Sequence, residues 1–159
     1  MKTNLVQFSK EEVDKVWPLA KELIHKACIR AGGFVSEEHI KEYCKKGTMQ
    51  LWLATTEDNE VLCVGVTEIR KYPNYSVCDA KIVTGKRYKE WFDQIDKVAE
   101  WAKEQGCKKM EIFSRPGYVP LFKQKGCKSK VGVALIMPGY VSSRYNFIPS
   151  CVGLKPIFS

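Results

Sequence analysis

The nucleophilic and metal-binding side chains of this sequence are few and widely spaced. It has only two histidines, His25 and His39, and both stand in segments of helical periodicity with no acid or cysteine at a matching position. The seven cysteines are an odd number and include no C-x-x-C pair, so neither a zinc site nor a disulfide framework is predicted. We expect both histidines on helix surfaces, and most cysteines as small core residues in a reducing compartment.

The charged residues form a second group with chemical potential, and they are unevenly distributed. Residues 1–80 carry a net charge of −1 and residues 81–159 one of +9, which together make the formal +8 of the chain. After Gln105 the only acid is Glu111. This basic C-terminal third predicts either a solvated face or a surface for an acidic protein or a phosphate-bearing ligand. No aromatic-interleaved motif accompanies the charge, which argues against a nucleic-acid binder.

Length and hydrophobicity set the framework that must position these groups. A chain of 159 residues that is 45% hydrophobic suits one domain with its own core. No run reaches the ~18 apolar residues that span a membrane. The N-terminus, MKTNLVQFSKEE, lacks the apolar centre of a signal peptide, so we expect an intracellular protein without a membrane segment.

Periodicity along the chain predicts helices and strands in an order typical of an α/β fold with a mixed sheet. The first helix follows a capping box at Ser9, with Pro18 as a kink or break. The other predicted helices are Ser36–Lys46, about Tyr88–Gln105 and about Val119–Lys125. The predicted strands are Met49–Thr55, Val61–Arg70, Ser76–Thr84, Met110–Ser114 and Cys127–Met137.

The predicted domain spans residues 1–138, because Pro138 and Gly139 follow the last strand. Residues 139–159 have no clear period but are too apolar for a solvated tail. We expect the segment Tyr140–Ser159 to dock, either on its own domain or on a protein partner, and the apparent completeness of the domain favours the partner.

The order of elements carries a resemblance to a known family. Leu121-Phe122-Lys123-Gln124-Lys125-Gly126 looks like the L-Y-x-K-x-G element of the GNAT (Gcn5-related N-acetyltransferase) superfamily, and the similarity covers about Val13–Met137. It implies an acyl-CoA N-acyltransferase fold, with a mixed, mostly antiparallel, splayed sheet flanked by helices. Trp52–Gly126 also looks like GNAT-like proteins of bacteriophages and prophages. Short-tailed phages use a GNAT-like domain as an internal virion protein.

The resemblance places a cofactor site at the end of the third predicted strand. Active family members carry a Q/R-x-x-G-x-G/A loop there, whose amides bind the pyrophosphate of acetyl-CoA at a helix N-terminus. The corresponding stretch reads Val83-Thr84-Gly85-Lys86-Arg87, with one glycine kept and the second missing. Lys86 and Arg87 could supply charge in place of amides. Alternatively, they are an exposed basic start of a helix.

The resemblance also implies catalytic positions. Many family members have a tyrosine whose hydroxyl protonates the departing thiolate, and Phe122 stands at that position, leaving Tyr118 as the candidate substitute. A general base for an amine substrate could be Glu68 or Asp79, on strands near the splay of the sheet. For Glu68, an ion pair with a basic neighbour on its strand is an equal alternative.

Two functions of different classes follow. The favoured prediction is a GNAT-fold protein with a degenerate acyl-CoA site, a non-catalytic structural or interaction component of a bacteriophage, located in the host cytoplasm or the virion. The altered loop, Phe122, the basic surface and the apolar tail support it. The alternative is an active, divergent acetyl-CoA-dependent N-acyltransferase acting on an amine or a protein lysine. Gly85 with its basic neighbours supports that alternative.

Overall fold

The structure of the chain is a computed structural model. It describes residues 3–30, 32–33, 35–114, 119–124, 128–130 and 141–146, and at 113–114, 119, 122–123, 128–130 and 141–146 it describes the backbone alone. Within these residues, no helix has the length and apolar character needed to cross a membrane.

Within the described part of the chain, seven strands form one mixed sheet. They are β1 (Thr3–Phe8), β2 (Met49–Thr56), β3 (Val61–Lys71), β4 (Ser76–Gly85), β5 (Cys107–Ser114), β6 (Lys128–Lys130) and β7 (Val141–Asn146). Their order across the sheet is β1-β2-β3-β4-β5-β7-β6. Neighbours are antiparallel except β4 and β5, which are parallel and therefore need a crossover connection between them.

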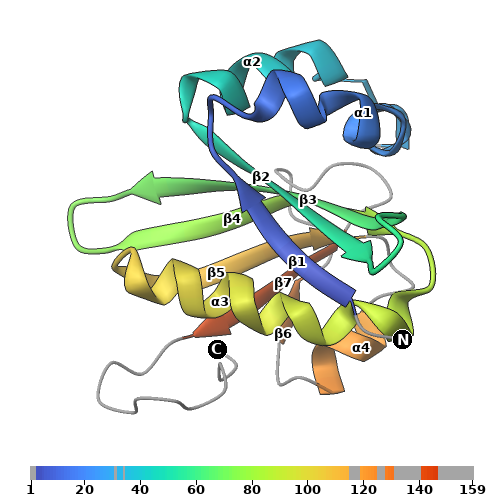
Figure 1. Cartoon of the computed structure of the whole chain (residues 1–159). Coiled ribbons are helices and arrows are strands. Elements are labelled where there is room, and N and C mark those ends of the chain that lie inside the picture. Colours follow the sequence, from blue (N-terminus) through green and yellow to red (C-terminus); the bar gives the residue numbers. More distant parts are fainter. Residues whose placement is uncertain are drawn as a thin grey trace.

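Helices cover both faces of this sheet. The α-helices of the described residues are α1 (Val13–Arg30), α2 (Glu37–Lys46), α3 (Ile95–Glu104) and α4 (Val119–Gln124). α1 and α2 lie over one face, and α3, in the β4–β5 crossover, lies against the other (Figure 1). Each face has its own core: Ile24 of α1 packs in one with Val64 of β3, and Trp91 and Met110 lie beside α3 in the other. The predicted fold class, a mixed and mostly antiparallel sheet flanked by helices, is confirmed.

The two N-terminal helices form largely as predicted. The Glu12 carboxylate accepts from the Ser9 backbone N–H at 3.0 Å, and α1 continues through Pro18 without a break. At α2 the capping partner of Ser36 is His39, whose Nδ1 accepts from the Ser36 backbone N–H at 3.3 Å. Both histidines are exposed on helices, as expected, so His39 has a structural role at the helix start.

The helix predicted from Tyr88 to Gln105 is the largest departure from expectation. Two 3₁₀ turns, η1 (Tyr88–Glu90) and η2 (Phe92–Gln94), come first, and the α-helix begins only at Ile95. Arg87 is in the left-handed region with φ 55°, and the Trp91 indole N–H donates to the Lys86 carbonyl oxygen at 2.8 Å. A 3₁₀-helix has three residues per turn and an α-helix 3.6, and over a few residues both place the same apolar residues on one side. Hydrophobic periodicity therefore could not distinguish a 3₁₀-helix from an α-helix here.

Two strands were not predicted. β1 is a short edge strand whose side chains split between the cores, with Leu5 on the α3 side and Phe8 on the α1 side. β7 lies within the segment expected to be a tail and pairs antiparallel with β5. The sheet thus extends past Pro138, and this part of the segment docks on its own domain. Of the strand predicted at Cys127–Met137, Lys128–Lys130 forms β6, and the remainder lies outside the described residues.

Candidate functional site

The parallel strands β4 and β5 separate part way along their length. Their pairing begins at Ser76 on β4 and ends where Ala80 lies beside Ile112 of β5. Beyond this pair β4 continues along β3, whereas β5 continues along β7. No later β4–β5 pair occurs among the residues that the structure describes. We call this point, at the Ala80–Ile112 pair, the fork.

A β-bulge in β4 stands at the fork. Val66 pairs with Ile82 and Thr67 with Ala80, so Lys81 is an extra residue in β4. The bulge reverses which residues face which core. Ala80 packs in the core beside α3, whereas Ile82, two positions later, packs in the core under α1.

Three carboxylates lie in neighbouring register positions across the sheet at the fork. Glu68 of β3 pairs with Asp79 of β4, which pairs with Glu111 of β5. Like charges placed directly opposite one another repel. Arg70 reduces this repulsion, because its Nε lies 2.6 Å from Asp79 Oδ2 and 3.4 Å from Glu68 Oε1. Lys81 Nζ lies 3.5 Å from Glu68 Oε1. We call these five residues the fork cluster.

Asp79 is the group of the fork cluster with the most unusual proton affinity. It is 3% exposed, and this burial raises the pKa of Asp79 to about 6, although Arg70 and Lys81 act in the opposite direction. A carboxyl group with this pKa can exchange a proton near neutral pH. Of the two candidate bases, Asp79 therefore has the more suitable environment. Glu68 forms an ion pair with Arg70, which was the alternative predicted for it, and its role as a general base stays a prediction.

The stretch predicted to hold the cofactor, Val83–Arg87, contains the last three residues of β4 and the two residues that follow. Val83 and Thr84 are buried. A Cβ added at Gly85 would lie 2.1 Å from the Leu62 carbonyl oxygen and 2.7 Å from Cys63 Cα. The Lys86 backbone N–H donates to the same Leu62 oxygen at 2.8 Å. Glycine is therefore required here by the close approach of β4 to β3, which is a structural reason independent of any ligand.

The two cations of this stretch are exposed, and both have carboxylate partners. Lys86 Nζ lies 2.8 Å from Glu60 Oε1, and Arg87 Nη1 lies 3.3 Å from Glu60 Oε2. The Arg87 Nε also donates to Glu90. The hydrogen bond from Lys86 is the main reason that the pKa of Glu60 is lowered, and Arg87 lowers the pKa of Glu90 in the same way. We call Glu60, Lys86, Arg87 and Glu90 the loop cluster.

Several of these partners were missed in the sequence. Glu60 stands in the polar turn between β2 and β3, and only the strand pairing brings it to the end of β4. Arg30, in the last turn of α1, donates from Nη2 to Thr84 Oγ1 at 2.9 Å, a contact between segments far apart in the chain. The bulge at Lys81 was also missed, because in the sequence Lys81 looks like an ordinary polar residue of an alternating strand.

Two other predicted positions fall outside the side chains that the structure describes. Tyr118 lies outside the described residues, and Phe122 is described only as backbone within α4, so the thiolate-protonating position stays a prediction. Among the described residues, no group of three or more His, Cys, Asp or Glu could hold a metal ion. The described cysteines are all free and buried, as expected: Cys28, Cys44, Cys63, Cys78 and Cys107.

The fold of this chain, a mixed sheet with helices on both faces, is similar to the folds of solved acetyltransferases. A probable acetyltransferase from Staphylococcus epidermidis is 15% identical, with a TM-score of 0.62 over 89% of this chain and 96% of that one. A GNAT-family acetyltransferase from Staphylococcus aureus is 15% identical, with a TM-score of 0.60 over 91% and 98% of the two chains. The PaiA N-acetyltransferase from Thermoplasma acidophilum, solved with coenzyme A, is 12% identical, with a TM-score of 0.54 over 92% and 100%.

This chain therefore has the fold of the GNAT acetyltransferases. No protein-family model matches the sequence, and no curated protein matches it either. At these identities the likeness establishes the fold alone, so activity has to be argued from the residues of the fork and the loop.

Proposed function

We propose that this chain is a GNAT-fold protein with a degenerate acyl-CoA site, and that it serves as a non-catalytic interaction component. The observation that carries the proposal is the state of the backbone at the end of β4. An anion-binding loop offers backbone N–H groups at the start of a helix. Here the Lys86 N–H is bonded to Leu62, and the α-helix that should follow directly begins only at Ile95.

The charges of the loop cluster support the same conclusion. Lys86 and Arg87 were the residues that could have replaced missing amides with charge. Both are already paired with carboxylates of their own chain, so an incoming diphosphate would have to displace Glu60 and would meet Glu90 beside it. These pairs support the proposal that the loop does not bind the pyrophosphate of coenzyme A.

The finer form of the proposal is a component associated with a bacteriophage, in the virion or the host cytoplasm. Its support is the resemblance of Trp52–Gly126 to phage GNAT-like proteins. A protein partner would be held by the C-terminal segment beyond β7, residues 147–159. The excess of basic residues after Gln105 suits a partner with an acidic surface.

Calorimetric titration with acetyl-CoA tests the proposal. The wild-type chain is expected to show no binding up to about 1 mM cofactor, a limit that corresponds to about −4 kcal/mol. The matched variant is Lys86→Ala/Arg87→Ala, with thermal unfolding as a check that it is folded. Micromolar binding by the wild-type chain that disappears in this variant would overturn the proposal and make acyl transfer the leading function.

A second candidate function, N-acyl transfer to an amine, is favoured by one observation. Asp79 lies buried at the fork with its pKa raised to about 6, which suits a group that accepts a proton from an ammonium substrate. The test is an acylation assay with a set of small amines as a function of pH. This candidate predicts a rate that rises with pH through about 6. In Asp79→Asn that rise is lost, whereas Glu68→Gln keeps it. If no amine in the set is acylated, this second candidate function is wrong.

A further inference from the structure

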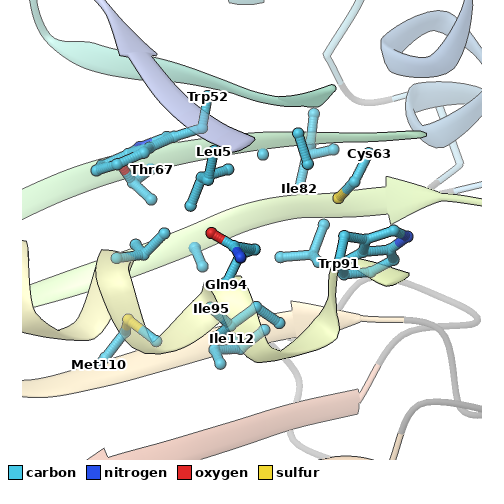
Figure 2. A pocket seen from close by; sticks show the side chains of 15 residues that line it. Leu5, Trp52, Cys63, Thr67, Ile82, Trp91, Gln94, Ile95, Met110 and Ile112 are labelled. Atoms are coloured by element: carbon cyan, nitrogen blue, oxygen red, sulfur yellow. The ribbon is translucent and has the colours of Figure 1, made fainter. Parts of the chain in front are cut away.

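A cavity of about 40 Å³ lies in the core between α3 and the sheet. Fifteen residues line it, from the five strands β1 to β5, from α3 and from the segment leading into α3 (Figure 2). It contains no residue of the fork cluster or of the loop cluster. Small residues leave the space open, since Ala54, Gly65 and Ala80 stand where larger side chains would fill it.

One polar atom in this cavity has no hydrogen-bond partner. Gln94 Oε1 is buried without a donor among the residues that the structure describes, and Figure 2 shows the Gln94 amide pointing in among apolar side chains. The other polar groups nearby are satisfied. Thr67 Oγ1 accepts from the Trp52 indole N–H at 3.0 Å and donates to Gln50 Oε1 at 2.8 Å. An unpaired buried acceptor is unfavourable, so the cavity has a specific requirement for a donor.

The cavity adjoins the fork. Ala80 and Ile112, the last β4–β5 pair, belong to its wall, and so do Ile82 and Val83 from the part of β4 beyond the separation. The cavity therefore extends to the part of the sheet where β4 and β5 no longer pair with each other.

We propose that this cavity binds a small neutral molecule with an apolar body of about three or four heavy atoms and one hydroxyl or N–H donor directed at Gln94 Oε1. Water alone fits poorly, because a buried water makes about three hydrogen bonds and the cavity offers one unpaired acceptor. An ion is excluded, because no lining residue carries charge. The volume limits the ligand to a molecule of a few heavy atoms. The inference does not depend on the proposed function.

A pair of isomers distinguishes the contribution of the hydrogen-bond donor to binding from that of the apolar body. 1-Propanol and methoxyethane contain the same atoms, but only the alcohol has a donor. Titration of the wild-type chain with each, followed by the NMR signals of the Ala80 and Ile112 methyl groups, should give saturable shifts. For four heavy atoms the dissociation constant of the alcohol should be roughly millimolar. The alcohol should bind about tenfold more tightly than the ether, as one hydrogen bond to a buried acceptor implies.

Three variants complete the experiment. Gln94→Leu removes the acceptor and should bring the two isomers within about twofold of each other. Gly65→Ala adds a methyl group with only ordinary contacts, to Trp52 Cβ at 3.6 Å, and should weaken binding of both isomers. Gln105→Leu, the same substitution as at Gln94 but at an exposed position after α3, should bind like the wild-type chain. The proposal is overturned if neither isomer saturates, if the ether binds as well as the alcohol, or if Gln94→Leu keeps the preference.

Discussion

The fork cluster and the loop cluster both pair carboxylates with lysine and arginine, but the pKa of Asp79 in the fork cluster shifts in the opposite direction to the pKa values of Glu60 and Glu90 in the loop cluster. In the loop cluster the carboxylates of exposed Glu60 and partly exposed Glu90 have lowered pKa values, because hydrogen bonds from their cations are the largest influence. In the fork cluster Asp79 has Arg70 at 2.6 Å, yet its pKa is raised to about 6. The two clusters differ in burial. Removing water from Asp79 destabilises its charged form by more than the half-exposed Arg70 stabilises it.

The charged residues that are easiest to notice in the sequence are therefore not the ones that contribute most to stability. Lys86 and Arg87 stand out in the sequence because they follow a glycine at a strand end, but water screens them and their partners. Glu68 and Asp79 lie on the two strands of one hairpin and Glu111 lies much later in the chain, so the three form a row only through the pairing of three strands. We expect substitutions at the fork, and in the backbone of the loop, to have larger effects than substitutions of the loop charges.

The largest expected effect comes from Gly85→Ala. The added Cβ would meet the Leu62 carbonyl oxygen at 2.1 Å, and this neighbour is backbone that cannot move without breaking the β3–β4 pairing. We expect a loss of about 4 kcal/mol in the free energy of unfolding, measured by urea denaturation. Gly65→Ala is the matched control, with its nearest contact at 3.6 Å and an expected change below about 1 kcal/mol. Equal effects of the two would show that the end of β4 is not held against β3.

Much of this fold could be predicted from the chain. The meander of β2, β3 and β4 follows from β-branched runs and polar turns, and α1 and α2 from capping signals and apolar periodicity. The 3₁₀ turns could not be predicted, because Trp91 and Ile95 suit either helical form. β7 could not either, since Val141–Asn146 has a largely polar sequence and forms a strand through its pairing with β5.

The candidate site was predictable only where its parts are local. Glu68 and Asp79 belong to adjacent strands of one hairpin, so both could be proposed as bases. Glu111 joins them through a parallel pairing whose register depends on the whole crossover. The partners of Lys86 and Arg87 include Glu60 from another turn, which charge counting along the chain cannot assign.

Arg70→Ala tests the fork cluster by removing the main partner of a buried carboxylate. Near pH 8 Asp79 is ionised, and without the arginine its charge is left with Lys81 and with the repulsion of Glu111. We expect a loss of about 3 kcal/mol in the free energy of unfolding at that pH, and a smaller loss near pH 5, where Asp79 binds a proton. Equal losses at both pH values would show that Arg70 acts by packing alone. In Arg70→Ala/Asp79→Asn most of the pH dependence should disappear.

Asp79→Asn isolates the pH dependence of the wild-type chain. The folded pKa of Asp79, about 6, lies above the ordinary value of 3.8, so the folded state binds the proton more tightly than the unfolded state. The stability that this group contributes is therefore complete below about pH 4 and is lost as pH rises to about 6, by about 2–3 kcal/mol. Denaturant unfolding across this range should show the decline in the wild-type chain and in Glu68→Gln, and a flatter profile in Asp79→Asn. An unchanged decline in Asp79→Asn would assign the titration to another group.

The smallest expected effect, and the sharpest test of the contrast, comes from Glu60→Gln in the loop cluster. Its carboxylate is bonded to Lys86 and Arg87, but all three side chains are exposed, so water and salt screen the pairs. The melting temperature should stay within about 2 °C of the wild-type value. Any difference should vanish in about 0.5 M NaCl, where the Debye length is only a few ångströms. A salt-resistant loss as large as that of Arg70→Ala would mean that the loop charges also hold the fold together, and burial would no longer explain why the two clusters differ.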